Sequence, residues 1–177
     1  MTKKKLGIGL IGAGFIGRAH AFAYHSMPVV FAEAGALPVL KVLCESPADR
    51  ARKLGAELGF PKTTTDWREL IADPEVDIVD ICAPSNLHRE IALAAIAAGK
   101  HLYCEKPVGL SGAESTEIAA AAAKKGIKTQ VGFSYVRHPV IGFAKKLIDD
   151  GTLGKVLHMR WTYNEDFMRD PEAPFTW

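Results

Sequence analysis

The sequence has few cysteines, no long apolar run and little imbalance of charge, and each absence excludes a class of protein. Its three cysteines form no C-x-x-C pair, which argues against a disulfide framework and a zinc site. No apolar stretch approaches the roughly 20 residues that cross a bilayer. Lysine and arginine total 22 against 20 acidic residues, so we expect neither nucleic acid nor a membrane as a partner. We therefore expect a cytoplasmic protein.

The histidines show no metal-binding spacing either. His20 and His25 are five residues apart, which does not place two ligands on one face of a helix, and the other histidines are scattered. Free cysteines such as Cys44, Cys82 and Cys104 are most often small buried apolar residues. The sequence therefore predicts no metal site.

A glycine-rich segment directly after an apolar run is the most informative feature that is present. Residues 6–11 read as a buried strand, and Gly12, Gly14 and Gly17 follow in the G-x-G-x-x-G pattern. These glycines permit a tight turn, a close approach of backbone amides to a pyrophosphate, and close packing of the next helix. A secretory signal peptide is the alternative, but the glycines would break its helical core. The pattern predicts a dinucleotide-binding loop.

Strand and helix patterns alternate along the rest of the chain, which predicts an α/β fold with a doubly wound, mostly parallel sheet. The expected strands are 39–44, 77–82, 101–104 and 128–133, and 155–163 alternates like a further strand. The expected helices are 18–26, 47–58, 66–72, 87–98, 111–125 and 140–150, with Asp66 as a candidate N-cap. This organisation is that of a Rossmann dinucleotide-binding domain.

Parallel strands all end at one edge of a sheet, and ligands bind there. Glu45 follows the second strand and is the expected ribose ligand, which favours NAD over NADP because its charge would repel a 2′-phosphate; a solvated loop residue is the alternative. Tyr135 and Arg137 are candidate substrate residues, with a purely structural role equally open. The candidate cofactor-binding residues are Gly12, Gly14, Phe15, Ile16, Gly17, Glu45, Ala83, Pro84, Asn86, His88, Glu105 and Lys106.

Several blocks in one order carry a resemblance to a known family. The glycine loop is followed by D-I-V-D-I-C-A-P at 77–84, by His88, by A-G-K-H at 98–101 and by E-K-P at 105–107. With these blocks the chain resembles the Gfo/Idh/MocA oxidoreductases, named for glucose-fructose oxidoreductase and inositol dehydrogenase. The resemblance implies NAD as cofactor, oxidation of a hydroxyl of a sugar or polyol, and Lys106 as the active-site lysine that polarises the reacting oxygen.

The resemblance also implies a second domain. It places the dinucleotide-binding domain at 1–136 and the beginning of an α+β domain at 137–177, whose sheet carries much of the substrate site and the contact of a homo-oligomer. The general-base histidine is then expected after residue 177, so we expect a truncated chain that turns over poorly alone. A dinucleotide-binding regulatory module without catalysis and a redox-assisted glycoside hydrolase of the same family are the alternatives.

Overall fold

The computed structural model describes residues 3–164 and 170–172. The chain divides into two compact units, Met1–Gly132 and Phe133–Trp177, and each is described here by itself. The predicted domain boundary after residue 136 stays a prediction. Among the described residues no helix is both long and apolar enough to cross a membrane.

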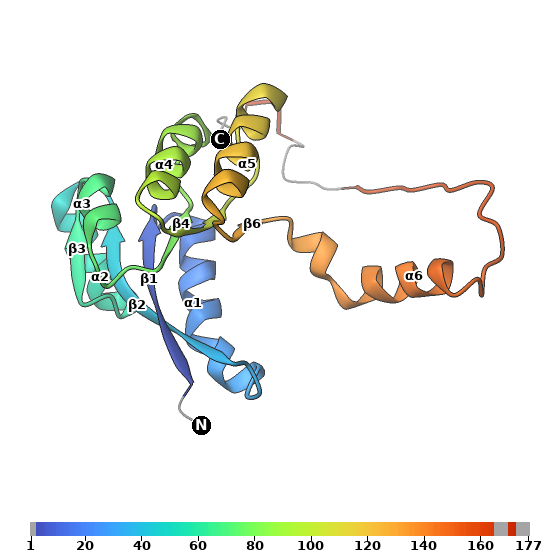
Figure 1. Cartoon of the computed structure of the whole chain (residues 1–177), viewed down its shortest axis with the longest axis horizontal. Coiled ribbons are helices and arrows are strands. Elements are labelled where there is room, and N and C mark those ends of the chain that lie inside the picture. Colours follow the sequence, from blue (N-terminus) through green and yellow to red (C-terminus); the bar gives the residue numbers. More distant parts are fainter. Residues whose placement is uncertain (1–2, 165–169, 173–177) are drawn as a thin grey trace. The chain divides into compact units, whose positions relative to one another are not determined.

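The first unit is built on a parallel sheet of six strands in the order β3-β2-β1-β4-β5-β6 (Figure 1). Every pair of neighbouring strands in it is parallel. The strand order reverses between β1 and β4, which in a doubly wound sheet opens a crevice at their carboxyl ends. The strands are β1 Lys4–Ile11, β2 Ala36–Cys44, β3 Lys62–Thr64, β4 Ile78–Ile81, β5 His101–Cys104 and β6 Thr129–Val131.

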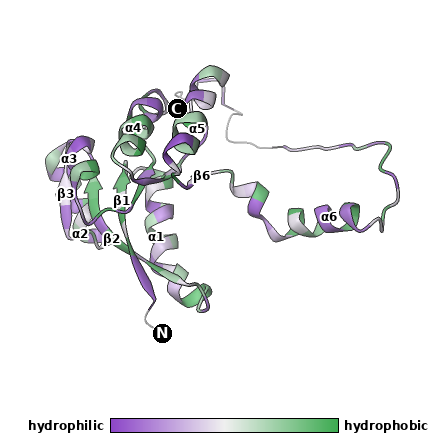
Figure 2. Ribbon diagram, in the orientation of Figure 1, coloured by the Kyte–Doolittle hydropathy of each residue, from purple (hydrophilic) through white to green (hydrophobic). Residues whose placement is uncertain are grey.

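Helices cover both faces of this sheet. The helices of the first unit are α1 Phe15–Val30, α2 Ala48–Leu58, α3 Trp67–Ala72, α4 Ser85–Ala97 and α5 Gly112–Lys125. One buried cluster joins α1 and α2 to side chains such as Ile8 and Leu10 of β1. The other joins α3, α4 and α5 to Val79 and Ile81 of β4. Figure 2 shows the hydrophobic colouring along the central strands that these two layers enclose. The predicted doubly wound α/β fold is therefore confirmed.

Glycine in β1 allows a helix to approach the sheet closely. A Cβ atom built on Gly9 would lie 2.5 Å from Cδ2 of Leu70 in α3, and Leu70 has no exposed surface. The bare backbone of Gly9 thus makes room for one of the largest side chains of the core.

Three predictions of secondary structure need correction. The sequence pattern predicts no strand at β3, because Lys-Thr-Thr has no apolar residue, and the strand forms by pairing with β2. Helix α1 continues beyond residue 26 through Pro28, whose fixed φ suits a helix at the cost of one hydrogen bond. The predicted strand 155–163 is wrong, because these residues lie in no strand ladder and their alternation finds no pairing partner among the described residues.

The second unit contains a short 3₁₀ helix, η1 Ser134–Arg137, and the helix α6 Pro139–Asp149. The side chain of His138 accepts a hydrogen bond from the backbone N–H of Val140 and so caps α6. The helix agrees with the predicted range 140–150. Part of the predicted domain 137–177 lies outside the described residues.

Candidate functional site

The register of the sheet brings the ends of its central strands to one level. Ile11 of β1 pairs with Cys44 of β2 and with Ile81 of β4, and Ile81 pairs with Cys104 of β5. The residues that come next in the chain therefore lie side by side at one edge, and they are Gly12, Glu45, Cys82 and Glu105. This edge flanks the switch point between β1 and β4, where doubly wound sheets bind ligands.

The glycine loop leads into helix α1 without a side chain that caps the start of the helix. Gly12 adopts φ +89°, which favours glycine, and Gly14 is the N-cap with no side chain capping the helix. A Cβ on Gly14 would meet no atom within 4 Å, whereas one on Gly17 would lie 2.0 Å from the carbonyl oxygen of Gly12. The loop is thus closely packed at Gly17 and open at Gly14. An uncapped helix N-terminus beside an open glycine is a suitable place for a pyrophosphate.

Phe15 and Ile16 lie in the first turn of α1 and are both exposed, Phe15 to 91 %. Their backbone N–H groups therefore lie at the N-terminal end of α1, next to the glycine loop. The first turn contains no acidic side chain that would compete with an anion.

Glu45 is held against the glycine loop. Its Oε2 accepts a hydrogen bond of 2.8 Å from the backbone N–H of Ala13, and its Oε1 accepts one of 2.9 Å from Ser46. Arg50 approaches the same carboxylate, with Nε 3.6 Å from Oε1. A carboxylate has about four acceptor positions, so two remain for ribose hydroxyls. Glu45 therefore shapes the glycine loop, and its role as a ribose ligand stays a prediction.

His88 lies behind the loops that follow β4 and β5. Its ring is only 1 % exposed, with Nε2 2.8 Å from the carbonyl oxygen of Ala83 and Nδ1 2.8 Å from that of Pro107. Both ring nitrogens are thus engaged by backbone carbonyls. His88 ties the two loops together from the protein side, while Pro84 of the first loop and Asn86 in the first turn of α4 are exposed.

Glu105 and its neighbour Lys106 differ in exposure. Glu105 is 8 % exposed and lies beneath the edge, whereas Lys106 is exposed. The two predicted substrate residues, Tyr135 and Arg137, belong to the second unit. Within that unit the ring of Tyr135 stacks edge-on against that of Tyr163, with centroids 5.7 Å apart. The predicted cofactor residues thus lie at or next to one edge of the sheet in the first unit. The predicted substrate residues belong to the second unit.

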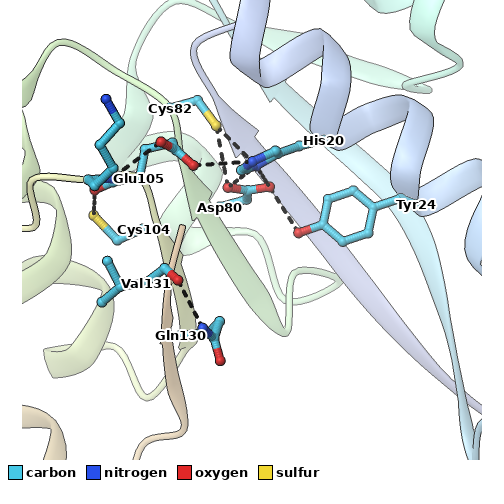
Figure 3. A network of polar contacts seen from close by, with 9 residues as sticks. His20, Tyr24, Asp80, Cys82, Cys104, Glu105, Gln130 and Val131 are labelled. Carbon is cyan, nitrogen blue, oxygen red and sulfur yellow. Dashed lines mark hydrogen bonds and ion pairs between the residues drawn. The ribbon is translucent and has the colours of Figure 1, made fainter. Parts of the chain in front are cut away.

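Sequence reasoning missed a buried polar cluster beside this edge, which Figure 3 shows. It consists of His20, Tyr24, Asp80 and Cys82 together with Glu105. The signal was available, because Asp80 is a charged residue in the middle of an apolar strand and must have a polar partner when buried.

A parallel sheet of this order, a glycine loop before α1 and an acidic residue after β2 together define a dinucleotide-binding Rossmann domain. Residues 6–133 match the family GFO_IDH_MocA, described as an oxidoreductase family with an NAD-binding Rossmann fold. The chain belongs to this family. The expected family and its cofactor, NAD, are thereby confirmed.

Several relatives are named as dehydrogenases of levoglucosan or of inositols. Levoglucosan dehydrogenase of Pseudarthrobacter phenanthrenivorans is 45 % identical over 98 % of this chain and 45 % of its own length. An inositol 2-dehydrogenase/D-chiro-inositol 3-dehydrogenase of Lactiplantibacillus plantarum is 35 % identical over 86 % of this chain and 42 % of its own. The chain spans less than half the length of these relatives.

Solved structures agree with these sequence matches. A levoglucosan dehydrogenase in complex with NADH and levoglucosan has a TM-score of 0.94 at 45 % identity, covering 98 % of this chain and 47 % of the other. A scyllo-inositol dehydrogenase from Lactobacillus casei with bound NAD(H) and scyllo-inositol has a TM-score of 0.75 at 27 % identity, covering 85 % and 43 %.

Proposed function

We propose that this chain is the cofactor-binding part of an NAD-dependent dehydrogenase that oxidises a hydroxyl of a sugar or polyol. The observation that carries the proposal is the alignment of the glycine loop, Glu45 and the Glu105–Lys106 pair at the carboxyl edge of β1, β2 and β5. The substrate class rests on the relatives, which are named for levoglucosan and inositols.

The residues present fit a dinucleotide. The open space at Gly14 admits the backbone approach that a pyrophosphate needs, and the uncapped first turn of α1 supplies N–H donors. Glu45 retains acceptor positions for a ribose. NAD held by these residues would supply an acceptor for the hydride of the carbinol carbon.

Lys106 is the proposed catalytic residue of this chain. Its ammonium group would donate to the reacting oxygen and stabilise the negative charge that develops there. The proposed cofactor contacts after β4 are Ala83 and Pro84 of the loop and Asn86 in the first turn of α4. Tyr135 and Arg137 remain proposed substrate residues. His88 supports the proposed site by linking two of its loops.

Other parts of the proposal concern setting and assembly. We propose a cytoplasmic location, which the three free thiols support because reducing compartments preserve them. We also propose a homo-oligomer, which is supported by large exposed apolar side chains of the second unit such as Val140, Phe143 and Trp161.

Calorimetric titration of the chain with NADH and NADPH tests the proposal. We expect NADH to bind more tightly than NADPH. Glu45→Gln should weaken NADH binding about tenfold, the effect of losing one charged hydrogen bond, and should reduce the preference between the two nucleotides. Glu33→Gln is the matched control, because Glu33 is exposed beyond the far end of α1. Failure of NADH to bind, or equal loss in both variants, would refute the proposed site.

Turnover provides the second arm of the same experiment. The chain is incubated with NAD and either levoglucosan or myo-inositol, and NADH formation is followed by absorbance. Any turnover should be abolished in Lys106→Met, which keeps the length of the side chain and removes its charge. Turnover that survives this substitution would remove Lys106 from the proposed mechanism.

A further inference from the structure

The buried cluster beside the proposed site is centred on an imidazole between two carboxylates. His20 extends from α1, Asp80 from β4, and Glu105 follows β5 (Figure 3). Nδ1 of His20 lies 3.1 and 3.0 Å from the two oxygens of Asp80, and Nε2 lies 3.4 Å from Oε1 of Glu105. One ring therefore joins an acidic side chain of β4 to the acidic side chain that directly follows the neighbouring strand β5.

Burial means that both carboxylates need hydrogen-bond donors or a positive charge beside them. Asp80 has no exposed surface and Glu105 only 8 %. A buried carboxylate is stable only when a donor or a positive charge accompanies it. Asp80 also accepts a hydrogen bond of 2.9 Å from the hydroxyl of Tyr24. For Glu105, His20 is a cationic partner when its ring is protonated.

The surroundings of the ring favour its protonated form. Burial lowers the pKa of His20, but the hydrogen bond and charge of Asp80 and the charge of Glu105 outweigh burial, so the pKa lies above its ordinary value of 6.5. Within the described part of the chain, the Cys82 thiol also contacts the ring, 3.3 Å from Nδ1, and the Tyr103 ring lies edge-on to it with centroids 4.9 Å apart. Burial and Asp80 raise the pKa of Cys82, so the thiol stays neutral.

The same cluster is poorly suited to a metal ion. His20, Asp80 and Cys82 offer ligand atoms that lie within 4.8 Å of one another. A thiol binds metal as a thiolate, and the pKa of Cys82 is shifted in the opposite direction. The oxygens of Asp80 already accept from Tyr24 and contact His20. A hydrogen-bonded charge bridge accounts for this geometry without an ion.

Glu105 contacts both His20 and the backbone of Lys106, and so links the two residues. Its Oε2 accepts a hydrogen bond of 3.3 Å from the backbone N–H of Lys106. On its other side the backbone of Gly132 leaves no room, since a Cβ there would lie 1.9 Å from Oε1. The carboxylate of Glu105 is therefore held between His20 and Gly132 while it binds the backbone that carries Lys106.

Helix α1 gives this arrangement a second connection. The helix begins at the glycine loop and carries His20 on the face that packs toward β4. The segment proposed to bind the pyrophosphate and the segment that carries Lys106 are thus linked through one side chain.

We propose that His20 is a positioning residue of the active site: it fixes the carboxylate of Glu105, and through it the backbone of Lys106, relative to helix α1. This inference rests on the proposed function, because it assigns the positioning to a site that Lys106 would serve. Its structural content, the link from His20 to Lys106, is measurable without cofactor or substrate.

Two substitutions at the same position separate the two ends of the bridge. The amide nitrogen of Asn takes the place of Nδ1 in His20→Asn, which keeps a donor to Asp80 and removes the contact with Glu105. The amide nitrogen of Gln takes the place of Nε2 in His20→Gln, which does the reverse. His25→Asn on the same helix is the control, because the ring of His25 contacts the carbonyl oxygen of Leu58 instead.

The readout is the backbone amide resonance of Lys106 in the free chain, followed over a pH series after selective labelling of lysine. In the wild type we expect this resonance to titrate with the same midpoint as the His20 ring. His20→Asn should abolish that titration and shift the amide proton upfield, whereas His20→Gln and His25→Asn should leave the amide proton near its wild-type position at low pH. A merely structural role would not distinguish Asn from Gln at position 20.

Identical shifts in the Asn and Gln variants, or no shift in either, would overturn the proposal. If neither variant folds, the protonation of Nε2 of His20 is measured in the wild type at neutral pH. A nitrogen without a proton cannot donate to Glu105, so that result would also overturn the proposal. NADH titration is run on the same samples. A wild type that fails to bind NADH while Lys106 follows His20 would refute the proposed function and leave the positioning link standing.

Discussion

Gly14 and Gly17 should respond in opposite ways to the same added methyl group. In Gly17→Ala the Cβ would lie 2.0 Å from the carbonyl oxygen of Gly12, and neither atom belongs to a flexible side chain. Overpacking against backbone at so short a distance costs about 2–3 kcal/mol, of which alanine's better helix propensity restores about 1 kcal/mol, so the net cost is about 1–2 kcal/mol. We expect the melting temperature of Gly17→Ala to fall by about 3–8 °C.

Gly14→Ala should instead leave the fold largely intact and weaken cofactor binding. Its Cβ would meet no atom within 4 Å, and its φ of −67° is accessible to alanine. Loss of a good N-cap residue costs at most about 1 kcal/mol. The methyl group would enter the space through which the backbone approaches a pyrophosphate, so NADH affinity should fall at least about tenfold.

Thermal unfolding and NADH titration of both variants and the wild type test this pair of expectations. The reasoning is refuted if Gly17→Ala is as stable as the wild type, since the close contact would then be relieved at no cost. It is equally refuted if Gly14→Ala binds NADH with wild-type affinity.

Three further predictions concern the free chain in urea denaturation. Asp66→Ala should lower the free energy of unfolding by about 1 kcal/mol, because Asp66 accepts from the N–H of Arg68 at the start of α3; Asp66→Asn, which can also cap, should retain most of it. Leu70→Ala should cost about 2–5 kcal/mol because Leu70 is fully buried, and a smaller loss would mean that α3 collapses into the cavity. Because the pKa of His20 is raised in the folded chain, protonation of His20 increases the free energy of unfolding below pH 6.5. This contribution is lost as the pH rises through the pKa of His20 in the folded chain. The urea midpoint should therefore fall over that interval in the wild type and stay flatter in His20→Gln; equal slopes would contradict this.

Much of the fold could be predicted because local signals and tertiary structure agree. The strand β5 spans the predicted residues 101–104, and Asp66 caps α3 as expected. Where the local signal is weak, pairing decides: β3 has no apolar pattern and exists because β2 offers it a partner. The alternation of 155–163 shows the converse, since alternation without a paired neighbour makes no ladder.

The site was predictable only in part, for a related reason. Which residues follow each strand can be read from the sequence, and parallel pairing then brings them to one edge. The depth of each side chain at that edge cannot be read in this way. His88 and Glu105 are predicted cofactor-binding residues, and that role stays a prediction; the structure shows that both are buried and that each has partners inside the protein. The charged Asp80 in an apolar strand signals that a buried partner exists, but His20 cannot be identified as that partner from local sequence, because the bridge joins three separate segments.

The reversal of strand order between β1 and β4 has a consequence for folding. The loops on either side of it come from segments about seventy positions apart in the chain, and they meet only after the crossover from β3 through α3 to β4 has formed. A ligand that contacts both the loop after β1 and the loop after β4 binds only when these strands are paired. It therefore binds the folded sheet and binds a partly folded chain weakly. Such a ligand would slow amide hydrogen exchange along the whole of β1 and β4, including residues that it does not contact. The reason is that unfolding that separates the two strands requires the ligand to dissociate first.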